Sequence, residues 1–162
     1  MKKQLLAACF LTLFFNQNSL AQNEKDRLTI SNLMDKQAID WTAGNIEAFM
    51  QGYWHSDSLM FIGSSGITYG WQQTFENYKK RYPDRATMGA LKFDILKMDF
   101  HSKNTCWLLG KWHLTRPEKG DVGGYFTLIF KKIKGSMVDS ERPHELVINS
   151  RISLSKAAAS AL

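Results

Sequence analysis

Residues 39–49, with the sequence IDWTAGNIEAF, contain the end of one helix and the start of the next. Gly44 favours the left-handed backbone conformation in which helices commonly end. Asn45 has a side-chain oxygen that can cap a following helix, and Glu47 lies in the positively polarised first turn of that helix. The stretch therefore predicts two consecutive helices that are broken at Gly44.

The helix before this break is expected over residues 23–43. Apolar side chains recur there at steps of three and four residues, which is the spacing of one buried helix face; these are Ile30, Leu33, Met34, Ala38 and Trp41. A short second helix is expected over residues 45–52. A third is expected over residues 71–82, because Pro83 follows and three basic residues near its end complement the helix dipole.

The second half of the chain changes to the alternating pattern of strands. Two short strands are expected at residues 58–63 and 67–70, and three long ones at 90–101, 105–116 and 125–133, the first of them with a bulge at Leu96–Lys97. Short turns between the long strands indicate an antiparallel meander. Helices first and strands last predict an α+β fold with the helices packed on one face of a curved sheet.

The N-terminus has the three parts of a secretory signal. Lys2 and Lys3 are followed by an apolar run over residues 5–15 and by a polar stretch that ends at Ala21. The run has about eleven residues, fewer than the ~20 of a membrane-spanning helix. We therefore expect residues 1–21 to be a signal peptide that is cut between Ala21 and Gln22, and the mature protein to be periplasmic or secreted, with no membrane attachment.

Composition excludes several kinds of site from the remaining chain of about 141 residues. Cys106 is its single cysteine, so neither an internal disulfide nor a thiolate metal cluster is expected. Its formal charge falls from +6 to +4 with the loss of two lysines, and no basic tract is interleaved with aromatic residues, so no nucleic-acid partner is expected. We expect no metal and no cofactor.

The order of these elements resembles the nuclear transport factor two, ketosteroid-isomerase-like or SnoaL-like superfamily. Residues 39–49 are similar to its helix-break-helix pattern, residues 53–70 to its first hairpin, and residues 71–82 to its third helix. The resemblance covers about residues 24–135 and implies one cone domain over residues 22–135. In such a domain a curved antiparallel sheet wraps around three N-terminal helices and encloses an apolar cavity.

The resemblance also bears on chemistry, because members of this superfamily include isomerases, cyclases, dehydratases and silent binding modules. Fold therefore does not decide function. Where ketosteroid isomerases have an aspartate base and a tyrosine, this chain has Gly63–Ser64 and Gln37. Neither site can take a proton from a carbon acid, so isomerase chemistry by that route is not expected. Asp40 is the best acid/base candidate if its carboxylate faces the cone.

Aromatic residues are spread over every expected element, and a cone with residual volume would be lined by some of them. The expected pocket-lining residues are Trp41, Tyr53, Trp54, Phe61, Tyr69, Trp71, Trp112 and Phe126. Three hypotheses follow. The first is a module that binds a small apolar or aromatic molecule, and the second is a SnoaL-like acid/base enzyme acting on a carbonyl-containing substrate. The third is a frameshifted, non-functional copy. A homodimer through the open sheet face is a further expectation.

The third hypothesis comes from residues 136–162, which lack an alternating apolar pattern and are expected to form a low-order tail. The superfamily resemblance implies a last strand reading roughly Trp-x-Ile-Val-x-Asp-His-Thr-Ser. Met137 followed by any valine codon spells tryptophan one base later, and the following codons allow the rest of that strand. A frameshift near Gly135 would remove the last strand and leave residues 125–133 as an exposed edge, with weak pairing by residues 145–152 as partial rescue.

Overall fold

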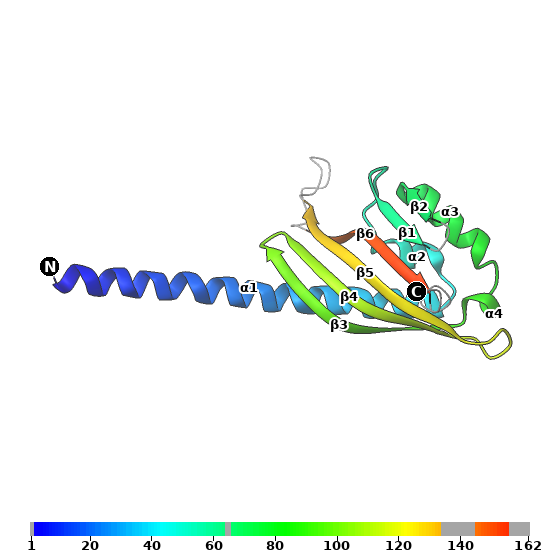
Figure 1. The fold of residues 1–162 in the computed structure, drawn as a ribbon, viewed down its shortest axis with the longest axis horizontal. Helices are drawn as coiled ribbons and strands as arrows, with labels where there is room; N and C mark the ends of the chain where they lie inside the picture. The colour runs from blue at the N-terminus through cyan, green and yellow to red at the C-terminus, as the bar shows by residue number, and fades with distance from the viewer. Residues whose placement is uncertain (1, 64–65, 134–144, 156–162) are drawn as a thin grey trace.

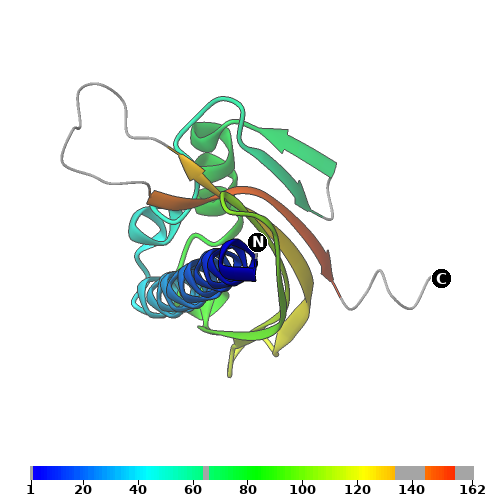
Figure 2. The same cartoon turned by 90° about the vertical axis from the view of Figure 1, so that its left-hand side faces the viewer.

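The computed structural model describes residues 2–63, 66–133 and 145–155. These residues contain four helices: α1 (Lys2–Thr42), α2 (Ile46–Met50), α3 (Trp71–Arg81) and α4 (Arg85–Met88). They also contain six strands that form one sheet: β1 (Met60–Gly63), β2 (Gly66–Tyr69), β3 (Ala90–Ser102), β4 (Thr105–Thr115), β5 (Val122–Ile133) and β6 (Glu145–Ser155). Two of the helices precede β1, and the other two lie between β2 and β3 in the chain. Figure 2 shows this sheet curving around α1. The α+β fold class predicted from the sequence is confirmed.

The helix break at residues 42–46 forms as predicted. Gly44 has a φ of 83°, in the region that favours glycine, and the side chain of Asn45 accepts a hydrogen bond from the backbone N–H of Ala48. The hydroxyl of Thr42 accepts a hydrogen bond from the backbone N–H of Leu91 at 3.0 Å, which joins the end of α1 to the start of β3. The break therefore fixes where the long helix meets the sheet.

The strands have the order β2-β1-β6-β5-β4-β3, in which β1 and β6 run parallel and all other neighbours antiparallel. The register of β3 and β4 shifts between Ile95 and Lys97, which confirms the predicted bulge. The helix α4 was not predicted; Asp84 caps it by accepting a hydrogen bond from the backbone N–H of Thr87 at 2.7 Å.

The expectation that residues 136–162 cannot supply the last strand is wrong, whereas the alternative that residues 145–152 pair with the sheet is confirmed. Glu145–Ser155 forms β6 between β5 and β1, so β5 is not an edge of the sheet. Ile148 is fully buried; its N–H donates to the carbonyl of Gly52 and its carbonyl accepts from the N–H of Trp54, both at 3.0 Å. Two neighbouring strands satisfy the backbone of β6. Its sequence also carries an alternation that the expectation overlooked, because apolar residues recur at even positions, namely Leu146, Ile148, Ile152 and Leu154. Residues 136–144 and 156–162 of the expected tail lie outside the described residues.

One core joins the helices to the concave face of the sheet. Ile30, Met34 and Trp41 of α1 pack with Leu108 of β4 and other buried side chains. The first half of α1 projects beyond the sheet (Figure 1). In the part of the chain that is described, no helix combines the length and the apolar character that crossing a bilayer requires.

Candidate functional site

Most side chains on the concave face of β3, β4 and β5 are apolar. In β4, alternate residues Cys106, Leu108, Trp112 and Leu114 face the core, and all but Trp112 are buried. Trp112 lies opposite Phe93 of β3 in the register of the two strands. A set of apolar side chains on this face packs against the core but is only partly buried, namely Leu91, Phe93, Ile95, Met98, Phe100 and Trp112.

Glycine makes room for one of the large rings on this face. A Cβ atom at Gly110 of β4 would lie 2.5 Å from Cζ of Phe126, the neighbouring residue on β5. The Phe126 ring therefore lies directly over the backbone of β4, and its edge meets the ring of Phe93 at a centroid distance of 5.2 Å. Phe93 and Phe126 thus form one continuous apolar floor across the three strands.

The three tryptophans expected at the pocket on α1, α3 and β4 differ in the hydrogen bonding of their indole N–H groups. Nε1 of Trp41 donates to the carbonyl of Met88 at 3.1 Å, and Nε1 of Trp71 donates to the carbonyl of Met50 at 2.9 Å. Nε1 of Trp112 is also buried, but it has no acceptor among the described residues. The indoles of Trp41 and Trp71 therefore link their helices to α4 and α2 through hydrogen bonds. Nε1 of Trp112 makes no such link within the described residues.

The other expected pocket residues occupy several environments. Trp41, Tyr53, Trp71 and Phe126 are buried in the core, Trp54 and Phe61 are partly buried, and Tyr69 on β2 is 63% exposed. The sheet thus brings Trp112 and Phe126 together on the concave face. Trp41 belongs instead to an aromatic cluster, in which its ring centroid lies 4.7–5.7 Å from those of Phe49, Tyr78 and Tyr82.

Asp40, the expected acid/base residue, lies near the end of α1. Its side chain is 18% exposed, and one carboxylate oxygen lies 2.6 Å from Nζ of Lys36, one turn earlier in the same helix. Its backbone carbonyl accepts a hydrogen bond from the N–H of Asn45 at the helix break. The carboxylate therefore has a cationic partner on its own helix.

Gln37 is a buried polar residue that was not among the expected site residues, although it is where ketosteroid isomerases have a tyrosine. It is 1% exposed, and its amide donates to the carbonyl of Phe49 at 2.9 Å. A Cβ atom at Gly52 would lie 2.6 Å from its Nε2, so glycine at 52 makes room for the amide. The signal in the sequence was its place on the apolar stripe of α1, seven residues after Ile30. A buried amide there links α1 to α2.

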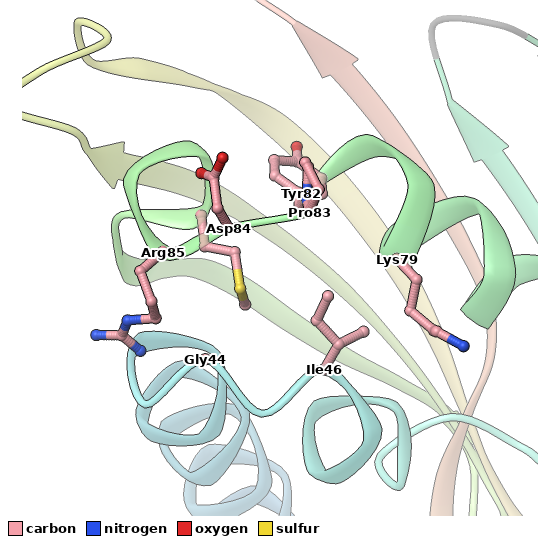
Figure 3. A pocket seen from close by; sticks show the side chains of 8 residues that line it. Gly44, Ile46, Lys79, Tyr82, Pro83, Asp84 and Arg85 are labelled. Carbon is pink, nitrogen blue, oxygen red and sulfur yellow. The ribbon is translucent and has the colours of Figure 1, made fainter.

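A hollow of about 400 Å³ lies on the helical side, where the break after α1 meets the ends of α3 and α4 (Figure 3). It is lined by Gly44, Ile46, Lys79, Tyr82, Pro83, Asp84, Arg85 and Met88. Hydrogen bonds from the side chain and backbone of Thr87 hold the pKa of the Asp84 carboxyl below its usual range. Lys79 and Arg85 point to opposite sides in Figure 3, so their charges do not converge on one point.

Within the described ranges, no group of three or more histidine, cysteine, aspartate or glutamate side chains is arranged to hold a metal ion. His113 and Asp121 approach each other at 3.1 Å on the β4–β5 hairpin, and the backbone N–H of Arg116 donates to the same carboxylate at 2.8 Å. That backbone hydrogen bond, followed by the one from His113, holds the pKa of Asp121 below its usual range. The arrangement closes the hairpin loop.

No protein-family model matches the chain, and no curated protein matches it either. Among solved structures, it is similar to an NTF2-like protein of unknown function from Shewanella oneidensis MR-1. The two are 34% identical, the match covers 79% of this chain and 98% of the other, and the TM-score is 0.69.

Two more distant structures share the fold. A ketosteroid isomerase-like protein from Erwinia carotovora atroseptica SCRI1043 is 11% identical, with 80% of this chain and 95% of the other covered and a TM-score of 0.59. Hexachlorocyclohexane dehydrochlorinase LinA-type3 from Novosphingobium barchaimii LL02 is 13% identical, with 84% and 90% covered and a TM-score of 0.60. With its curved sheet around α1 and its similarity to the Shewanella protein, the chain belongs to the NTF2-like superfamily.

Proposed function

We propose that the domain binds a small, mostly apolar or aromatic molecule on the concave face of the sheet. The observation that carries this proposal is the uneven burial of that face. Leu108, Phe126 and Leu128 are at most 1% exposed, whereas Phe93 and Trp112 face the same side and stay partly exposed. A large apolar surface that the protein leaves partly uncovered gains free energy when an apolar ligand covers it.

Two measurements test this proposal. Mass spectrometry of the undenatured protein is expected to reveal a bound small molecule that is released on unfolding. Phe93→Ala is then expected to weaken binding of that molecule about tenfold, because a Phe side chain supplies roughly 1.5–3 kcal/mol when it is covered. The matched control is Phe75→Ala on α3, another partly buried phenylalanine, which stacks on Trp71. Equal effects of the two changes would contradict the proposed location.

The second candidate is a SnoaL-like acid/base enzyme with Asp40 as the proton-transfer group. It is favoured by the partly exposed Asp40 carboxylate and by two proteins that share the fold, a ketosteroid isomerase-like protein and a hexachlorocyclohexane dehydrochlorinase. Those relatives are too distant in sequence to transfer a reaction to this chain. Binding without catalysis is the better-supported proposal for two reasons. The Asp40 carboxylate is paired with Lys36, and Gly63 is where an isomerase would have its aspartate.

Export of the domain is part of the proposal. The apolar run before Ala21 belongs to the half of α1 that projects beyond the sheet, so its removal would leave the core of the cone in place (Figure 1). The mature chain is expected to begin at Gln22, and mass spectrometry of its N-terminal peptide after export tests this. A chain that retains residues 1–21 would contradict it.

We also propose that two copies pair through the convex face of the sheet. Tyr125 and Ile129 of β5 are 49% and 36% exposed there, and Nζ of Lys111 lies 5.1 Å from the Tyr125 ring centroid. Exposed apolar side chains that lie close together are typical of surfaces that associate. Sedimentation of the wild-type chain is expected to show a dimer, and Tyr125→Glu a monomer.

A further inference from the structure

We infer that the ligand on the concave face carries a hydrogen-bond acceptor, such as a carbonyl oxygen, and that Nε1 of Trp112 is the donor that recognises it. This inference deepens the proposed function and rests on it. Its basis is the contrast among three indoles of this chain. Trp41 and Trp71 each donate to a backbone carbonyl, whereas the buried Nε1 of Trp112 has no acceptor among the described residues.

A buried N–H group without an acceptor is costly, and folded proteins satisfy nearly all of them. A phenylalanine in place of Trp112 would provide a similar apolar surface without this cost. The donor is useful if a partner from outside the chain supplies the acceptor. The rest of the indole is only partly buried and packs against the core, so a molecule that covers its exposed part lies next to the ring that carries the N–H.

The surroundings of Trp112 define the rest of the ligand. Phe93 lies opposite it on β3, and the Phe93 ring continues into Phe126. The nearest charged residues on β4, Lys111 and His113, are the neighbours of Trp112 in sequence, so they project from the opposite face of the strand. The site therefore offers one neutral donor within an apolar and aromatic surface. This suits an uncharged aromatic or aliphatic ketone, aldehyde or ether better than a carboxylate or phosphate.

The test uses two probes of nearly the same shape, acetophenone and ethylbenzene, of which the first alone has an acceptor oxygen. Acetophenone is expected to bind wild-type protein about tenfold more tightly than ethylbenzene, the ratio that one additional neutral hydrogen bond gives. In Trp112→Phe this ratio is expected to fall to about one while ethylbenzene binding stays within about twofold. Trp107→Phe is the matched control, because Trp107 is on the opposite face of the same strand.

A second readout follows the donor itself. The chain has five tryptophans, and the indole N–H resonance that disappears in Trp112→Phe identifies Trp112. That resonance is expected to move downfield with acetophenone and not with ethylbenzene. Equal affinities for both probes and an unchanged resonance would overturn this inference while leaving the proposed function intact. If neither probe bound, the proposed function would fail, and the inference with it.

Discussion

Lys132 near the end of β5 forms an ion pair with Asp26 on α1, across 106 residues of sequence. The two side chains are 14% and 7% exposed, and the second carboxylate oxygen of Asp26 accepts a hydrogen bond from Nε2 of Gln22 at 2.9 Å. This pair attaches the first packed turns of α1 to the far end of the sheet.

Removing one partner of this pair is expected to destabilise the fold strongly. Asp26→Asn leaves the Lys132 ammonium largely buried without its counter-charge, which costs about 3–5 kcal/mol in comparable pairs. Urea unfolding measures the difference. Asp94→Asn is the control, because Asp94 pairs with Lys92 on the surface, with side chains 50% and 72% exposed, and such pairs contribute at most about 1 kcal/mol. Similar losses for both variants would show that burial of the Asp26 pair has no special effect.

The buried Cys106 is expected to make stability fall at alkaline pH. Burial raises the pKa of its thiol from 9.0 to about 11. The unfolded chain therefore loses this proton first, and its ionisation draws the equilibrium toward unfolding between pH 9 and pH 11. The contribution is full below pH 9, decreases by up to about 1.4 kcal/mol per pH unit between pH 9 and pH 11, and changes no further above this window. Unfolding free energies of Cys106→Ala should decline less steeply over this window, and parallel curves would contradict the assignment.

Asp40→Asn separates the two candidate functions. If the domain only binds its ligand, the affinity is expected to stay within about twofold, and stability should change by about 0.3–0.5 kcal/mol because the partner Lys36 is 63% exposed. If Asp40 transfers a proton, turnover of a carbonyl substrate should fall about a hundredfold or more. Asp35→Asn, an exposed aspartate on the same helix, is the control for the loss of charge.

Deleting β6 is expected to damage the domain. A chain that ends at Ile133 leaves β5 without its partner on one side and β1 without its parallel neighbour. Exposed strand edges promote aggregation, so soluble yield and melting temperature should both fall. A chain that ends at Ser155 keeps β6 and is expected to behave like the full chain. If the shorter chain melted at the same temperature as the full one, β6 would not be a working part of the fold.

The frameshift near Gly135 stays a prediction about the gene. It requires the codons for residues 138–146 to spell Trp-Ile-Val-Ser-Asp-His-Thr-Ser when they are read one base later. The nucleotide sequence decides this directly, and synonymous codons that spell a different peptide would exclude the hypothesis. Because Glu145–Ser155 forms β6, a frameshift near Gly135 would have replaced one last strand by another and would not have removed it.

Much of the fold could be read from local sequence signals. Gly44 and Asn45 mark the helix break, and the phase slip at Leu96–Lys97 marks the bulge that appears between Ile95 and Lys97. These features depend on backbone preferences and on side-chain periods of a few residues, so the sequence near each position is sufficient to predict them.

The tertiary structure alone decided three other features. It inserted Glu145–Ser155 between β1 and β5 and paired Asp26 with Lys132. It also left the Trp112 N–H without an acceptor in the described part of the chain, although the indoles of Trp41 and Trp71 have one. Each depends on groups that are distant in sequence and meet only when the sheet closes around α1. Which strands a segment joins and whether a buried polar atom finds a partner are settled by that packing, so no pattern within a few residues could have revealed these pairings.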